Sequence, residues 1–336
     1  FKMALTYEQI ASNIRHKVFH PIYFLMGEEP YFIDSLTELL EEHVLEEVYK
    51  SFNLLVLYGR DVDAATIANQ ARTYPMSGNY QLIIVKEAQD VKDLEKLENY
   101  LGTFPESTIL VINYKYKKID GRKSFAKTLD KKGILFESKR LYENNIPDWI
   151  NKYLQNRGYS ISPKASQIMS DFLGNDLSKV KNELEKLMIS LPSGSKITEN
   201  EVEDKIGISK DFNVFELQKA LGRKDILKTN QIINYFGANK KDNPLVMVVT
   251  ILYSFFTKLL KYHYATDKSK NNIASVLGVN PFFVGDYQEA ASNYSIAAIV
   301  QIIAVLREYD LKSKGYGSNG VDDAELYQEM IYKILH

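Results

Sequence analysis

Residues 22–34 read Ile-Tyr-Phe-Leu-Met-Gly-Glu-Glu-Pro-Tyr-Phe-Ile-Asp. The apolar run ends at Gly27, and Leu36, Leu39 and Leu40 follow at helical spacing. An apolar run, a glycine and then apolar residues three and four apart predict a strand, a turn and a helix. A phosphate-binding loop has the same order of elements.

The turn lacks the residues with which such a loop binds phosphate. The P-loop pattern G-x-x-x-x-G-K-[ST] supplies backbone N–H groups, a lysine and a hydroxyl to the phosphates and Mg²⁺. Counting from Gly27, Phe32 replaces the second glycine, Ile33 the lysine and Asp34 the hydroxyl residue. These side chains leave the charge of a triphosphate uncompensated or repelled. Taken alone, the stretch favours an ordinary turn that never bound nucleotide.

Composition limits the class of protein. A chain of 336 residues is too long for one ordinary core, so we expect two or three domains. With 45% hydrophobic and 25% charged residues, the chain is predicted to be soluble and globular. The absence of cysteine excludes disulfides and thiolate chemistry. No signal-like start and no membrane-spanning apolar run stand out, which predicts a cytoplasmic protein. The net charge of −1 argues against a protein whose main function is to wrap nucleic acid.

The patterns predict an α/β domain followed by helical domains, at 1–140, 141–211 and 212–336. In the first domain, apolar runs alternate with helical patterns, as in a parallel sheet covered on both faces. The predicted strands are 22–26, 52–58, 81–85, 108–114 and 133–137, and the predicted helices are 34–45, 64–72, 93–100 and 121–129. After about Lys139 only helical spacing remains.

The last domain is predicted to be a helical bundle with surface left for partners. Its predicted helices are 214–221, 225–236, 244–264, 271–277, 281–291, 295–313 and 322–335. The three-domain layout resembles that of the AAA+ clamp-loader family. The motifs that carry the resemblance are 23–33, 71–78, 174–177 with 183–187, and 277–282. The resemblance covers nearly the whole chain and implies a P-loop-type sheet domain, a small helical lid and a helical collar for oligomerisation.

Further sites of such ATPases are altered in this chain. Lys86 stands where the strand should end in a Mg²⁺-binding aspartate, with Glu87 after it, and Leu177 stands where the lid should carry a sensor arginine. The Ser-Arg-Cys triplet of the ATPase subunits is absent, because the chain has no cysteine. Together these losses predict a degenerate AAA+ frame without a catalytic residue, cofactor or metal. The degenerate nucleotide site comprises Gly27, Phe32, Ile33, Asp34, Lys86, Glu87 and Leu177.

The resemblance implies a non-hydrolysing subunit for DNA replication. Such a subunit binds the β sliding clamp and opens one of its interfaces. It works in a hetero-oligomeric loader with ATPase subunits of the gamma/tau type and a subunit of the delta-prime type. ATP bound to other subunits drives this loader, and the subunit meets primed DNA indirectly or weakly.

The clamp contact is expected at Tyr74, Pro75 and Met76. A helix from Ala64 has to end by Tyr74, because the residue before a proline is pushed out of the helical region. In the family this turn projects a hydrophobic wedge, and the matching positions are Pro75 and Met76 with Tyr74 beside them. The alternative is that Met76 packs its own loop against the core.

A basic stretch suggests a second contact. Residues 114–132 contain eight lysines or arginines and two aspartates. Lys115, Lys117, Lys118, Arg122 and Lys123, with tyrosines among them, form a candidate DNA or partner patch. Charge runs are more often solvated faces, which is the favoured interpretation. Two alternative functions stay open: an ATP-dependent enzyme or switch with a noncanonical site, and a DNA-binding adaptor.

Overall fold

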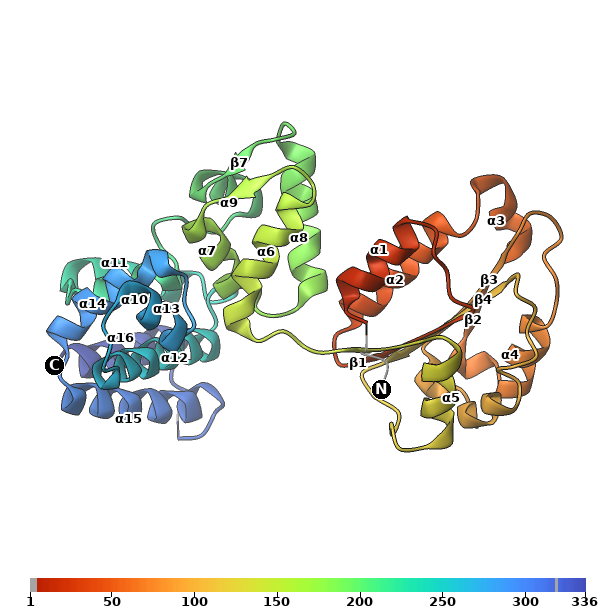
Figure 1. Ribbon diagram of the computed structural model, residues 1–336. Helices are drawn as coiled ribbons and strands as arrows, with labels where there is room; N and C mark the ends of the chain where they lie inside the picture. The colour runs from red at the N-terminus through yellow and green to blue at the C-terminus, as the bar shows by residue number, and fades with distance from the viewer. Residues whose placement is uncertain (1–4, 318–319) are drawn as a thin grey trace. The chain divides into compact units, whose positions relative to one another are not determined.

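The computed structural model describes residues 5–317 and 320–336 (Figure 1). The chain divides into two compact units, Phe1–Leu141 and Tyr142–His336, and each is described by itself. The predicted separation of a lid at 141–211 from a collar at 212–336 stays a prediction, because both fall in the second unit.

The first unit contains a parallel five-stranded sheet in the order β2-β3-β4-β1-β5. The strands are β1 Ile22–Gly27, β2 Leu54–Tyr58, β3 Gln81–Lys86, β4 Thr108–Lys115 and β5 Ile134–Ser138. All five strands were expected, but β2 begins two residues later than predicted. Phe52 and Asn53 instead end helix α3, Glu47–Asn53.

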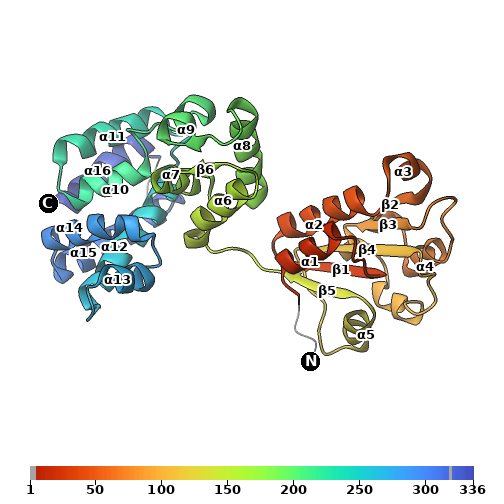
Figure 2. The same ribbon diagram turned by 45° about the horizontal axis from the view of Figure 1, so that its top comes forward.

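Helices cover both faces of this sheet (Figures 1 and 2). Helices α1, Tyr7–Arg15, and α2, Pro30–His43, pack on one face around the inward side chains of Tyr23 and Leu25. Helices α4, Ala64–Ala71, and α5, Ser124–Lys132, pack on the other face, on the side of Phe24. Alternate residues of a strand point to opposite faces, so the apolar run of β1 is buried on both sides.

The predicted helix at 93–100 is wrong in type, because Leu94–Asn99 forms the 3-10 helix η3. Its buried residues Leu94 and Leu97 are three apart, the repeat of a 3-10 turn. Helices α1 and α3 were not predicted. Two further 3-10 turns are η1, Gly59–Asp61, and η2, Ala88–Asp90.

The second unit is mainly helical, as expected. Its first helices are α6 Ile146–Gln155, α7 Pro163–Leu173, α8 Leu177–Ser190 and α9 Glu199–Ile206, preceded by the turn η4 Glu143–Asn145. The expectation that no strand occurs here is wrong in detail. Two-residue strands β6, Ser160–Ile161, and β7, Lys196–Ile197, pair in parallel and join the ends of two loops.

The rest of the second unit is a bundle around one apolar core. Its elements are α10 Val214–Gly222, α11 Ile226–Ala238, α12 Leu245–Tyr264, α13 Lys270–Leu277, η5 Pro281–Phe283, α14 Val284–Asn293, α15 Ile296–Ser313 and α16 Asp323–Leu335. By length and composition α12 could cross a membrane, contrary to the sequence-based expectation. Its residues Val248, Leu252 and Phe256 are buried in the bundle core, where an apolar helix of this length also fits.

Candidate functional site

The first unit carries two candidate sites at opposite edges of its sheet. Because the strands are parallel, their carboxyl ends meet at one edge, where β1 ends at Gly27 and β4 ends at Lys115. Ligands of open α/β sheets bind at such an edge. The turn between α4 and β3 lies at the amino edge, where β3 begins at Gln81.

The early start of α2 leaves no loop at the predicted nucleotide position. This helix begins at Pro30, so Phe32, Ile33 and Asp34 lie in its first turns and not in a loop. Ile33 is fully buried, and the ring of Phe32 lies 4.9 Å from that of Tyr7. Without the intervening loop residues, the backbone cannot wrap a phosphate as a P-loop does.

A carboxylate occupies the amino end of α2, where a phosphate would bind. The Glu29 side chain is buried and its Oε1 accepts a hydrogen bond from the backbone N–H of Tyr31 at 3.2 Å. Pro30, the first helical residue, has no N–H to donate. The helix end therefore already holds a negative group and offers an anion fewer donors than usual.

Gly27 is required by the approach of β5. Its φ is +129°, and a Cβ atom there would lie 2.0 Å from the carbonyl oxygen of Ser138. The N–H of Glu28 donates to that same oxygen at 3.1 Å. The glycine therefore serves strand packing, whether or not a phosphate is present.

The side chain of Lys115 lies at the carboxyl edge of the sheet, between two carboxylates. The Nζ of Lys115 lies 2.8 Å from Asp34 Oδ1 and 3.4 Å from Glu87 Oε1, and its side chain is only 14% exposed. Gln89 completes the group by donating to Glu87 and accepting from the N–H of Lys115. Burial alone would lower the pKa of Lys115, but the hydrogen bond and the charges of Asp34 and Glu87 outweigh burial and raise it.

This arrangement corrects one predicted role. Lys115 does not belong to an exposed basic patch, because its ammonium group points between two carboxylates. Lys115 neutralises the acidic side chains of Asp34 and Glu87 at this edge. Because the pKa of Lys115 is raised in the folded protein, the ion pair contributes its full stabilisation below the ordinary lysine pKa. This contribution is lost as the pH rises through the higher pKa of the folded state.

Replacing Lys115 with methionine should lower the free energy of unfolding by about 1–2 kcal/mol, measured by urea unfolding. The loss is below that of a fully buried pair because Asp34 is 45% exposed. Adding Asp34→Asn should restore part of the loss, since one unpaired carboxylate is removed. Lys117→Met, on an exposed neighbour, is the control with a change within about 0.5 kcal/mol. Equal stability of Lys115→Met and the control would contradict the role of Lys115.

The predicted clamp-binding turn exposes two large apolar side chains. Tyr74 is 76% exposed and Met76 is 81% exposed, while Pro75 between them is half-buried. Helix α4 ends at Ala71, before the proline, as predicted. The alternative that Met76 packs its loop against the core is wrong for this structure, because the side chain lies in solvent.

Two buried amides beside this turn are not predicted from the sequence. Asn53, at the end of α3, and Gln81, at the start of β3, hydrogen-bond to the backbone of the turn. The signal in the sequence that could have located them is a polar residue directly before an apolar strand, as for Asn53, or at its start, as for Gln81. Gly78 closes the turn with φ +79° and lies against the ring of Tyr49.

Family models match both units. The model described as "DNA polymerase III, delta subunit" matches residues 23–139, and the model of that subunit's C-terminal domain matches residues 211–333. This chain belongs to the DNA polymerase III delta subunit family. The result agrees with the predicted clamp-loader resemblance and with its α/β plus helical fold class.

Similar proteins span almost the whole chain. DNA polymerase III subunit delta of Bacillus subtilis is 25% identical over 327 residues, which are 93% of this chain and 91% of the relative. A probable delta subunit of Aquifex aeolicus is 22% identical over 313 residues, 88% of this chain and 86% of the relative. The solved Bacillus subtilis clamp loader delta protein YqeN covers 98% of this chain and 99% of its own, with 23% identity and a TM-score of 0.55.

The remaining predicted residues of this delta-family chain are placed as follows. Leu177 is buried at the start of α8 and packs in the core, so this helix end presents no cation at that position. In the basic stretch, Lys118 pairs with Glu137, Arg122 with Asp120 and Lys123 with Glu95. These pairs reduce the local positive charge, and DNA contact by the patch stays a prediction.

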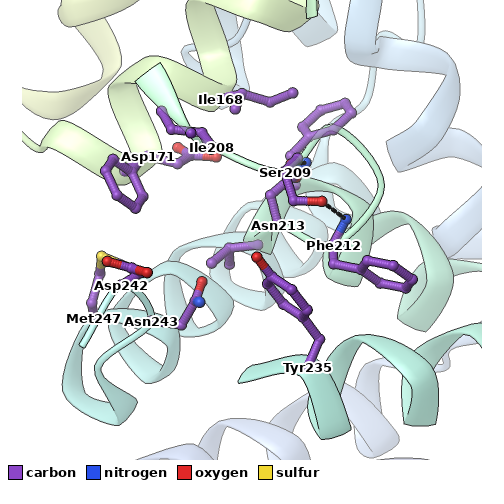
Figure 3. Close-up of a pocket in the computed structure, with 14 residues that line it drawn as sticks. Ile168, Asp171, Ile208, Ser209, Phe212, Asn213, Tyr235, Asp242, Asn243 and Met247 are labelled. Carbon is purple, nitrogen blue, oxygen red and sulfur yellow. Dashed lines mark hydrogen bonds between the residues drawn. The ribbon is translucent and has the colours of Figure 1, made fainter. Parts of the chain in front are cut away.

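A small cavity lies in the second unit between α7, the segment before α10, and the start of α12 (Figure 3). Asp171, Asn213, Tyr235 and Asn243 are among its lining residues. Within residues 5–317 and 320–336, no group of three or more His, Asp or Glu side chains is arranged to hold a metal.

Asp171 should make the stability of this unit depend on pH. Burial raises the pKa of its carboxyl to about 7, and the hydrogen bond from Gln167 and the charge of Lys258 lower it by less. Folded protein therefore holds a proton that unfolded protein releases between about pH 4 and about 7, so Asp171 destabilises the fold as pH rises through this window. Asp171→Asn should gain stability relative to wild type across that range, measured by urea unfolding. A difference that is independent of pH would contradict the assignment.

Proposed function

We propose that this chain is the clamp-loader subunit that binds the β sliding clamp and opens one interface of its ring during DNA replication. The observation that carries the proposal is the turn at 74–76, which exposes Tyr74 and Met76 on a hydrogen-bonded backbone. Isolated large apolar side chains on a fixed turn are suited to fill pockets of a partner. Membership of the delta subunit family supplies the context of the loader.

The arrangement at the predicted nucleotide position supports a subunit without turnover of its own. Glu29 caps the helix where phosphate would bind, and Lys115 fills the space between two carboxylates. The energy for opening the clamp would then come from ATP on gamma/tau-type subunits. Such a protein acts in the cytoplasm, where the chromosome is replicated.

The helical bundle would join the chain to the ATPase and delta-prime-type subunits. On α15, Ile296, Val300 and Leu311 are exposed at helical spacing, although the opposite face of the helix lies in the core. Exposed apolar side chains on one side of a helix favour burial against another subunit. These contacts would form the collar of the loader.

Purified chain is expected to be retained on immobilised sliding clamp and to show no shift in melting temperature with Mg²⁺-ATP. A nucleotide site filled at about 100 times its Kd would add about 2.7 kcal/mol of stability, which thermal unfolding detects readily. ATP binding and hydrolysis would favour the noncanonical ATPase instead. Absence of clamp retention, with tight and strongly salt-dependent duplex binding, would favour the DNA-binding adaptor.

A further inference from the structure

Two buried amide side chains stand beside the exposed turn. Asn53 is 4% exposed and Gln81 is 7% exposed. Residue Leu54 of β2 pairs with Leu82 of β3, so the amides occupy neighbouring positions just before these paired residues. Burying an amide costs free energy unless its donors and acceptors are paired.

Asn53 hydrogen-bonds to the backbone of two successive residues of the turn, Met76 and Ser77. Its Oδ1 accepts from the N–H of Met76 at 3.0 Å, and its Nδ2 donates to the carbonyl oxygen of Ser77. Rotating the Asn53 amide by half a turn would place its NH₂ group against the Met76 N–H and its oxygen against the Ser77 carbonyl oxygen. These partners therefore fix the orientation of the amide. An amide supplies both roles, whereas a carboxylate or an apolar side chain does not.

Gln81 holds the other end of the turn. Its Nε2 donates to the carbonyl oxygen of Thr73 and, at 2.7 Å, to Thr108 Oγ1. Its Oε1 accepts from Thr73 Oγ1 at 3.0 Å. The backbone is therefore tied directly before Tyr74 and again at Met76, while the side chains of these two residues stay in solvent.

We propose that Asn53 and Gln81 are positioning residues that hold the 73–77 backbone in its binding conformation before the partner arrives. The inference rests on the proposed clamp contact and adds how that contact is prepared. A turn that is already fixed loses little conformational freedom on binding, so more of the contact energy of Tyr74 and Met76 appears as affinity. Asn53 and Gln81 are buried and act through the turn.

The test is a double-mutant cycle of Asn53→Ala and Met76→Ser, with sliding-clamp affinity measured by calorimetry. Asn53→Ala alone should weaken binding about tenfold, which corresponds to about 1.4 kcal/mol. In the Met76→Ser background the same change should matter by less than about twofold, because Asn53 binds the backbone at Met76 and the side chain that it positions there has been removed. Hydrogen exchange of the Met76 amide, whose N–H donates to Asn53, should accelerate in Asn53→Ala. Asn79→Ala, an exposed amide just beyond the turn, is the matched control with unchanged affinity.

The outcomes separate this inference from the function on which it rests. If Met76→Ser alone leaves the affinity unchanged, the clamp contact and the positioning role both fail. If Met76→Ser weakens binding but Asn53→Ala does not, or if Asn53→Ala acts equally in both backgrounds, the positioning role alone is wrong. Should Asn53→Ala fail to fold, Asn53→Asp keeps the shape but sets an oxygen against the Ser77 carbonyl, and the same tenfold loss is expected.

Discussion

Replacing Tyr74 and Met76 together with serine is expected to weaken sliding-clamp binding by about 100-fold or more, equivalent to about 2.7 kcal/mol. Both side chains are large, apolar and mostly in solvent, so they contribute little to the fold. In a partner pocket they would be fully desolvated, and loss of such central anchors is where binding energy concentrates. Calorimetry or surface plasmon resonance of wild type and variant gives the comparison.

The controls for this result lie elsewhere on the chain. Tyr264→Ser removes a tyrosine that is 70% exposed at the end of α12 and should leave clamp affinity unchanged. The free energy of unfolding of the Tyr74/Met76 variant should change by no more than about 0.5 kcal/mol, as for other exposed positions. Unchanged clamp binding by a folded double variant would remove the turn from the proposed interface.

The two apolar residues offer different kinds of contact. Tyr74 is a rigid ring with two side-chain torsions, which suits an anchor. Met76 is unbranched and adapts to irregular apolar surfaces. From the sequence, the wedge was placed on Pro75 and Met76, but Pro75 is half-buried and Tyr74 is exposed. The ring of Tyr74 therefore replaces Pro75 as the partner of Met76 in the proposed contact.

Much of the fold follows from local patterns. The five strands are short apolar runs bounded by turn residues, and the long helices keep one apolar face over several turns. Helix α3 was missed because its Phe52 points to solvent, so the apolar residue was joined to the strand that follows. Helix α1 did carry a signal, since Thr6 and Gln9 form a capping box before the buried Ile10.

The candidate sites were less predictable because their contacts join distant parts of the chain. Lys115 follows the charge pattern of its neighbours in sequence, but β4 ends beside α2, and Asp34 then lies within 2.8 Å. No local pattern distinguishes this lysine from Lys117. The role of Asn53 likewise depends on a turn more than twenty residues away. Sequence spacing predicts which elements form, whereas these side-chain roles follow from which strand ends meet.

Gly27→Ala is expected to destabilise the first unit by about 3 kcal/mol or more. The added Cβ would lie 2.0 Å from the Ser138 carbonyl oxygen and 2.7 Å from its backbone nitrogen, at a φ of +129°. Because the obstructing atoms belong to the backbone of β5, a change of rotamer cannot relieve the clash. The residues pair directly in the sheet, so relief requires that the end of β1 or β5 move. Urea unfolding of the variant measures the effect.

Two further variants identify the cause. Gly121→Ala is the control, since its added Cβ meets nothing within 4 Å, and it should stay near wild-type stability. Adding Ser138→Ala to Gly27→Ala should not restore stability, because the closest atom is the Ser138 carbonyl oxygen and that atom remains. If the glycine were kept only for the close approach of a phosphate, Gly27→Ala would cost nothing in the nucleotide-free protein. Wild-type stability of Gly27→Ala would therefore support that explanation, whereas a large loss shows that the strand–helix joint needs its glycine for the close approach of β1 and β5.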